Sequence, residues 1–153
     1  MTINDIQDIL TELLDIMDIS YKNISITDVP FLASKRITVE SEESGILIGT
    51  KGEHLFALQN IIKRVVEARL APGEECEPYM IDVNDYNLAR INAIKKRAVD
   101  AAGRVRMFRH DVELEPMSSY ERLIVHAVLA SERDIATVSN GEGAHRRITV
   151  TMR

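Results

Sequence analysis

Several residue types are scarce in this 153-residue chain, and each scarcity excludes a class of protein. The single cysteine, Cys76, excludes an internal disulfide and fits a reducing compartment. Tryptophan is absent and aromatic residues make up 5% of the chain, so a binding surface built mainly on aromatic stacking is not expected. No apolar run is long enough to span a membrane, and no secretory signal pattern opens the chain. The composition therefore predicts a cytoplasmic protein without a membrane segment.

The charge of the chain is unevenly distributed. The formal net charge is −5, and residues 1–45 hold 9 acidic against 3 basic side chains. Residues 87–153 hold 12 basic against 8 acidic side chains, and 87–109 hold seven basic residues against Asp100 alone. A local basic face suits phosphate contacts even when the whole chain is acidic. The second half is therefore the better candidate for binding a polyanion through its side chains.

Hydrophobic periodicity in the first half predicts helices and strands in an α+β arrangement. Asn4 with Gln7 resembles a capping box at the start of the first helix. The strands alternate apolar and polar residues, and Pro30 lies in the connection between the first two. The expected elements are helices over 4–18 and 53–70 and strands over 20–28, 35–40 and 79–83.

A glycine pair with a lysine, Gly49-Thr50-Lys51-Gly52, precedes the second of these helices. Glycine accepts positive φ without steric cost, so the backbone can turn tightly there. The unpaired N–H groups at a helix N-terminus suit a phosphate, and Lys51 adds a full charge. These four residues are candidate ligands of a sugar-phosphate backbone. The alternative is a plain connection between two helices that happens to contain two glycines.

The second half continues with a basic amphipathic helix and a small sheet. Ser118 with Glu121 predicts a capping box that opens a helix to about residue 131. The residues Asn140-Gly141-Glu142-Gly143 predict the turn between the last two strands, because Asn-Gly tolerates the φ values that a hairpin needs. The expected elements are a helix over 87–106 and strands around 112–114, 135–139 and 147–152.

Arg122 and His126 are four residues apart, so they share one face of the helix that starts at Ser118. Arg122 could bind a phosphate through charge-assisted hydrogen bonds, and His126 could donate to phosphate or position Arg122. The alternative is an ordinary surface ion pair with Glu121 or Asp134. Arg146 and Arg147 alternate faces on the last strand, so one is expected to face a ligand and the other solvent or an acidic neighbour.

Two stretches of the chain resemble known nucleic-acid binding modules. Ile48-Gly49-x-x-Gly52-x-x-Leu55-x-x-Leu58 resembles the signature of the KH domain, whose Gly-x-x-Gly loop clamps about four nucleotides of backbone. The order helix–strand–strand–helix–helix–strand over residues 1–84 is that of the type II KH fold. The segment Tyr120-Glu121-Arg122-x-x-x-His126, with its flanks, resembles the Arg-xxx-His domain, a single-stranded nucleic-acid binding module, over residues 85–153.

A type II KH unit followed by an Arg-xxx-His unit is similar to the bacterial Jag (SpoIIIJ-associated) family. This resemblance implies RNA binding, a cytoplasmic location and association with a small KH-only protein. The family's usual N-terminal Jag domain is expected to be missing. Thr50 stands where the family often has a second basic residue between the glycines, and Leu123 stands where it often has a second arginine.

No catalytic or metal-binding pattern accompanies these motifs. The four histidines have no cysteine or carboxylate at metal-ligand spacing, and Ser118 has a better role as a helix cap than as a nucleophile. The sequence therefore predicts a non-enzymatic protein without cofactor, metal or small-molecule substrate. Its expected ligand is single-stranded RNA, with single-stranded DNA left open, and its expected partner is a KH-only protein or a second copy. The alternative is a protein-interaction adaptor with little nucleic-acid affinity.

Overall fold

The computed structural model describes residues 1–29 and 32–153, and it divides the chain into two compact units. The first unit is Met1–Asn87 and the second is Leu88–Arg153. Both units combine helices with a small sheet, which confirms the predicted α+β class. Pro30, expected in the first connection, lies outside the described residues. Within the described part of the chain, no helix is both long and apolar enough to cross a bilayer.

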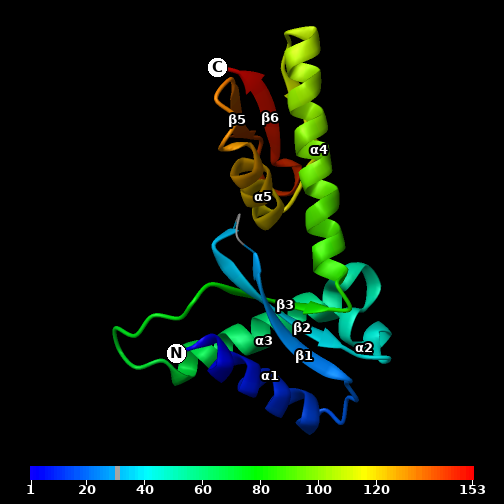
Figure 1. The fold of residues 1–153 in the computed structure, drawn as a ribbon, viewed down its shortest axis with the longest axis vertical. Coiled ribbons are helices and arrows are strands. Elements are labelled where there is room, and N and C mark those ends of the chain that lie inside the picture. Colours follow the sequence, from blue (N-terminus) through cyan, green and yellow to red (C-terminus); the bar gives the residue numbers. More distant parts are fainter. Residues whose placement is uncertain (30–31) are drawn as a thin grey trace. The chain divides into compact units, whose positions relative to one another are not determined.

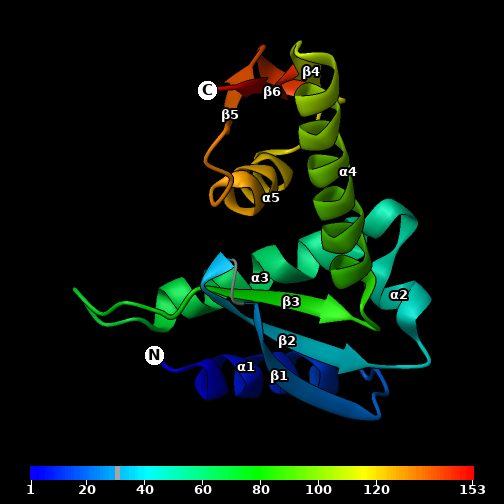
Figure 2. The same ribbon diagram turned by 45° about the horizontal axis from the view of Figure 1, so that its top comes forward.

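The first unit has the order helix–strand–strand–helix–helix–strand that was expected for residues 1–84 (Figures 1 and 2), and its short second helix, Ser44–Ile48, was not among the ranges predicted from periodicity. A single 3-10 turn, Thr50–Gly52, separates the second and third helices. The elements are α1 (Ile3–Ile16), β1 (Asn23–Val29), β2 (Ser34–Glu40), α2 (Ser44–Ile48), α3 (Glu53–Arg69) and β3 (Tyr79–Val83).

The three strands of the first unit form one sheet in the order β1-β2-β3. β1 pairs with β2 in an antiparallel manner, and β2 pairs with β3 in a parallel one. Ile37 and Val39 of β2 belong to the same buried cluster as Ile81 and Val83 of β3, together with the apolar stripes of α1 and α3. Since these strand residues alternate, they share one face of the sheet, and both helices cover that face.

The first helix begins earlier than its sequence pattern indicated. Thr2, not Asn4, is the N-cap, and its capping-box partner is Asp5, not Gln7. The Thr2 N–H donates to Asp5 Oδ2 at 2.7 Å, and the hydrogen bonds from Thr2 lower the pKa of the Asp5 carboxyl. The prediction was wrong because Asn and Thr are both good caps, and only the backbone geometry distinguishes them.

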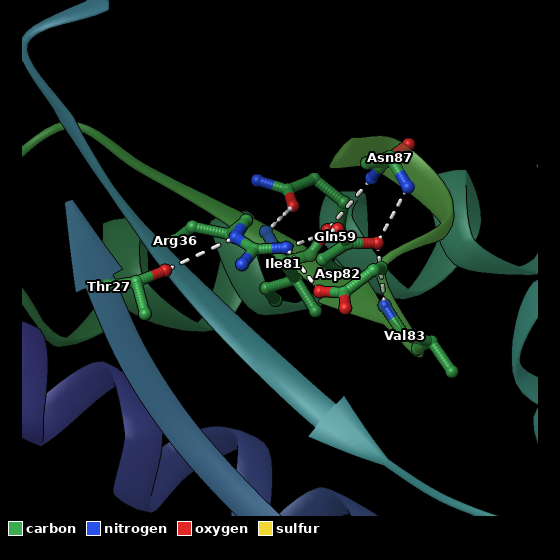
Figure 3. Close-up of polar contacts among 8 residues, drawn as sticks. Thr27, Arg36, Gln59, Ile81, Asp82, Val83 and Asn87 are labelled. Atoms are coloured by element: carbon green, nitrogen blue, oxygen red, sulfur yellow. Dashed lines mark hydrogen bonds and ion pairs between the residues drawn. The ribbon is translucent and has the colours of Figure 1, made fainter. Parts of the chain in front are cut away.

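A buried carboxylate joins β2 and β3 to the start of the next helix (Figure 3). Asp82, on β3, is fully buried and accepts hydrogen bonds from the backbone N–H groups of Val83 (2.8 Å) and Asn87 (2.7 Å). Arg36 of β2 donates to its other oxygen at 3.1 Å. A buried charge is tolerated when it is paired and hydrogen-bonded in this way.

The free edge of β3 is satisfied by side chains (Figure 3). Gln59 of α3 accepts a hydrogen bond from the Ile81 N–H at 2.6 Å. Asn87 donates its side-chain amide to the Ile81 carbonyl at 2.9 Å. An edge strand otherwise presents unpaired backbone groups that invite association, so these two amides close the edge at its centre.

The second unit consists of two α-helices, a sheet in the order β4-β6-β5 with every neighbouring pair antiparallel, and a short 3-10 turn, Gly143–His145, in the connection from β5 to β6. Small residues on the long helix, including Ala98, Ala101 and Ala102, are buried and allow close packing. Ile148 and Val150 of the central strand and Ile124 of the shorter helix are fully buried. The elements are α4 (Tyr86–Phe108), β4 (Val112–Glu113), α5 (Ser119–Leu129), β5 (Ile135–Asn140) and β6 (Arg147–Met152).

We expect Arg36→Met to destabilise the first unit by about 3 kcal/mol, because it leaves the buried Asp82 carboxylate without its cationic partner. Denaturant titration followed by hydrogen exchange of the β2 and β3 amides measures this loss. The matched control is Lys35→Met, since Lys35 pairs with the exposed Asp28 and should matter little. Equal effects of the two substitutions would contradict the role assigned to Asp82.

Candidate nucleic-acid interface

The loop between α2 and α3 turns through three residues with positive φ. Gly49 has φ +70° and ψ −175°, a combination that essentially only glycine adopts. Lys51 has φ +54° and Gly52 has φ +85°. Thr50 and Lys51 are exposed at the tip of the turn, whereas Gly52 is buried. The sequence-predicted loop residues therefore form one tight turn directly before α3.

Neighbouring side chains leave no room for a Cβ atom at Gly49 or Gly52. A Cβ atom on Gly49 would lie 2.5 Å from the ring carbon Cγ of His54, and one on Gly52 would lie 2.9 Å from Cε1 of Tyr86. The His54 ring is held in place by a hydrogen bond of 2.7 Å between its Nδ1 and the Ile46 carbonyl. The sequence left the role of His54 open; in the structure it packs against the loop.

The start of α3 leaves backbone donors uncapped. Gly52 is its N-cap, and no side chain hydrogen-bonds there. Within the described residues, the N–H groups of Thr50 and Lys51 have no backbone acceptor beyond their own short turn. The dipole of the 17-residue α3 adds partial positive charge. The acidic Glu53 in its first turn is exposed and opposes this field.

The helix that carries Arg122 and His126 starts where the capping box predicted. Ser118 accepts a hydrogen bond from the Glu121 N–H at 3.3 Å, and Glu121 accepts one from the Ser118 N–H at 2.8 Å. Arg90 of α4 also binds Glu121 at 2.8 Å. Although burial opposes it, this set of hydrogen bonds lowers the pKa of the Glu121 carboxyl. The capping box thus fixes the first turn of α5.

Arg122 is held by neutral groups. It donates to the Met117 carbonyl at 2.9 Å and to the Ser119 hydroxyl at 2.8 Å. Among the described residues it has no carboxylate partner, because Glu121 binds Arg90 and Asp134 binds Arg106. The alternative interpretation of Arg122 as half of a surface ion pair is therefore wrong. A guanidinium has five N–H donors, so three remain after these two bonds.

Arg122 and Arg146 line the same open hollow of about 520 Å³ in the second unit. Arg146 is exposed, and its Nε donates to the Ser139 hydroxyl at 3.0 Å. Arg147 instead lies 3.5 Å from the Glu113 carboxylate across the sheet. The two neighbouring arginines thus have different surroundings, which the sequence alone left open. The other residues lining the hollow are Pro116, Met117, Ser118, Ser119, Glu121, Gly143 and Ala144.

His126 is not among the residues that line this hollow. It is partly buried, and its Nδ1 lies 2.7 Å from the Thr137 hydroxyl on β5. Thr137 and Ser139 hold His126 and Arg146 respectively, and sequence analysis did not identify either of them. Their spacing of two places both on one face of β5, which was a readable signal, but their partners depend on tertiary contacts.

The basic residues of α4 divide into paired and free groups. Arg106 binds Asp134 through two hydrogen bonds of 2.7 and 2.8 Å. No group of three or more potential metal ligands occurs among the described residues. Ion pairs join Arg90 to Glu121, Arg97 to Glu115 and Arg106 to Asp134, whereas Lys96, Arg104 and Arg109 form no ion pair in the described chain. The pKa of Asp134, which Arg106 lowers most, is lowered further by the charge of Arg109.

Comparison with known proteins identifies part of this architecture. Residues 92–152 match the family of the R-3-H domain, which is the Arg-xxx-His domain under its short name. The chain therefore contains such a domain, and the matched range includes Arg122, His126, Arg146 and Arg147. Curated relatives share the name RNA-binding protein KhpB. The protein from Bacillus subtilis is 30% identical over 130 residues, which is 82% of this chain and 61% of the relative.

Two further relatives with the same name extend this comparison. The protein from Lactiplantibacillus plantarum is 31% identical over 117 residues, covering 76% of this chain and 35% of its own length. That from Clostridium symbiosum is 29% identical over 117 residues, covering 76% of this chain and 51% of its own length. The chain thus spans from about a third to three fifths of these relatives. Matches of this length exceed the second unit, so they extend into the first.

We expect Gly49→Ala to destabilise the first unit by at least about 1 kcal/mol, because alanine is strained at this φ and its Cβ meets His54. The matched control is Gly45→Ala in α2, where the added Cβ would meet nothing within 4 Å and helix propensity improves. Thermal unfolding of both variants measures the difference. Equal melting temperatures would contradict the loop geometry.

The Arg106–Asp134 pair predicts a pH dependence of stability. Hydrogen bonds from Arg106 lower the pKa of Asp134 from 3.8 to about 2. The folded-state pKa lies below the unfolded one, so the stabilisation is present above about pH 4 and lost as the pH falls towards 2. We expect Asp134→Asn to unfold more easily than wild type at pH 6, with the difference shrinking below pH 4. Urea titrations of Asp100→Asn, an exposed acid on α4, serve as the control.

Proposed function

We propose that this chain is a non-enzymatic single-stranded RNA-binding protein that holds sugar-phosphate backbone at two places. The observation that carries the proposal is that Arg122 and Arg146 line one open hollow while neither has a carboxylate partner in the described chain. The Arg-xxx-His domain match and the names of the relatives support it. The proposed modules are a type II KH domain over residues 1–84 and an Arg-xxx-His domain over residues 85–153.

The first proposed contact uses the backbone of the Gly49–Gly52 loop. The N–H groups of Thr50 and Lys51, together with the uncapped start of α3, would hydrogen-bond phosphate oxygens. The absence of side chains on the two glycines allows close approach, and Lys51 adds a charge. Since neighbouring Glu53 opposes a polyanion, this contact alone should be weak.

The second proposed contact uses side chains. Arg122 is oriented by Met117 and Ser119 before any ligand arrives, so little side-chain entropy is lost on binding. Arg146 faces the same hollow and is the better ligand of the last two arginines, because Arg147 lies beside Glu113. His126 acts through its bond to Thr137, which fixes α5 against β5.

These features fit membership of the Jag family, and with it association with a small KH-only protein or a second copy of the chain. RNA is proposed over DNA on the names of the relatives. A second candidate function, a protein-interaction adaptor, is favoured by one observation. The outer face of α1 forms an acidic hollow lined by Asp8, Glu12 and Asp15, beside the exposed Ile16.

Fluorescence anisotropy of a labelled mixed-sequence RNA of about 20 nucleotides, at several salt concentrations, tests the RNA proposal. We expect Arg122→Gln and Arg146→Gln each to weaken binding and to reduce the salt slope by about 0.7, the value for one phosphate on a single strand. Arg147→Gln is the matched control and should change the slope less. A matched DNA strand measures the preference for ribose.

The loop contact is tested in the same titration by changing Thr50 and Lys51 together to aspartate. The paired substitution places two negative charges at the turn and should remove that contact. Affinity within twofold of wild type would show that the loop does not bind. Absence of binding by the wild-type chain at tens of micromolar in low salt would instead favour the adaptor, whose partners should survive nuclease treatment.

A further inference from the structure

The C-terminal turn of α4 exposes an aromatic pair that the function proposed above does not use. Phe108 is 56% exposed, and its ring stacks on that of His110 with centroids 5.9 Å apart and planes inclined by 18°. Sequence periodicity ended this helix at residue 106, but the structure extends it to Phe108. The extension places an aromatic ring in solvent at the end of the most basic helix of the chain.

The backbone conformation at Arg109 brings the rings of Phe108 and His110 together. Arg109 has φ +57°, a left-handed conformation that costs a non-glycine residue about 1 kcal/mol or more. Its N–H bonds the Val105 carbonyl at 2.9 Å, which closes the helix and reverses the chain. His110 is further fixed by its Nδ1 at 3.2 Å from the Asp111 carbonyl. A strained residue thus holds an exposed stacked pair.

Two exposed guanidinium groups that form no ion pair in the described chain accompany this pair. Arg104 lies one helical turn before Phe108 and Arg109 follows it, and neither forms an ion pair in the described chain. Arg106 is already neutralised by Asp134 and Glu132. Exposed aromatic rings beside free guanidinium groups are the combination on which single-stranded nucleic acids stack their bases.

This turn and the Arg122–Arg146 hollow lie at opposite ends of β6. Arg147 starts β6 next to the hollow, whereas Met152 at its other end pairs with Ile135, beside the Asp134 that binds Arg106. Five residue steps along a strand span about 17 Å. The two places can therefore engage different nucleotides of one strand.

We propose that Phe108 and His110 form a platform on which one base of the bound single strand stacks, with Arg104 and Arg109 contacting the flanking phosphates. This inference rests on the RNA binding proposed above and adds a contact to bases, which the loop and the hollow lack. A lipid surface is a poorer match, because the exposed large apolar residues of α4 are Val99, Met107 and Phe108. Val99 lies about two helical turns before the other two, so they form no continuous apolar stripe.

Two RNA strands of about 20 nucleotides test the platform: a normal one and one with abasic residues throughout its centre. We expect Phe108→Ala to weaken binding of the normal strand at least fivefold with an unchanged salt slope, and to leave the abasic strand within twofold of wild type. Phe108→Tyr should retain binding, and Phe108→Leu should behave as Phe108→Ala, because leucine keeps apolar area but lacks a π-face.

Val99→Ala is the matched control, since Val99 is a similarly exposed apolar residue on α4, and melting curves verify that all variants fold. Binding within twofold for Phe108→Ala, while Arg122→Gln still weakens it, would overturn the platform and leave the proposed function standing. Equal losses on both strands would also overturn it. Loss of binding to vesicles of anionic lipid, with RNA binding unchanged, would assign the turn to a membrane surface instead. Absence of RNA binding by wild type would overturn both proposals.

Discussion

The first N–H groups of a helix have no partner inside the helix, and the structure supplies side-chain partners for α1 and α5 but none for α3. α1 and α5 both begin with a capping box, in which a hydroxyl and a carboxylate close the first turn. α3 begins at Gly52 with no side-chain cap. Its N-terminal donors and those of the preceding turn therefore remain open to a ligand. The proposed loop contact depends on this omission, and the rigidity of Arg122 depends on the cap of α5.

This division explains how an acidic protein could hold a polyanion. Residues 1–86 carry 16 acidic and 7 basic side chains, so a contact made of side chains would be unfavourable there. Backbone N–H groups provide a local positive field whatever the surrounding charge. The second unit, with its surplus of arginine, can use guanidinium groups instead. The two units thus support the same proposed ligand by different chemistry, each suited to its own charge.

Local sequence patterns predicted most helices and strands correctly, but they did not predict which side chains hydrogen-bond or form ion pairs across the fold. The capping box at Ser118 and the glycine turn before α3 were readable because each depends on residues within a few positions. Thr2 replaced Asn4 as the first cap, since neighbouring residues of similar capping preference cannot be ranked without backbone geometry. The different surroundings of Arg146 and Arg147 depend on Ser139 and Glu113, which the fold brings across the sheet. Strand alternation could not decide between them, because Arg146 lies just before β6, which begins at Arg147.

Each of the two proposed contacts can bind few phosphates, so tight binding would require both of them. The hollow holds two arginines, and the loop offers two free amides and one lysine, so neither can neutralise many phosphates. Because both belong to one chain, occupation of the first makes binding at the second intramolecular, provided that one strand can reach both. Affinity would then come from joint occupation, which favours long flexible strands over short ones. One contact could also open while the other still holds the strand. The protein could then move along the strand without dissociating, and because phosphate contacts carry no sequence information, it would bind many sequences.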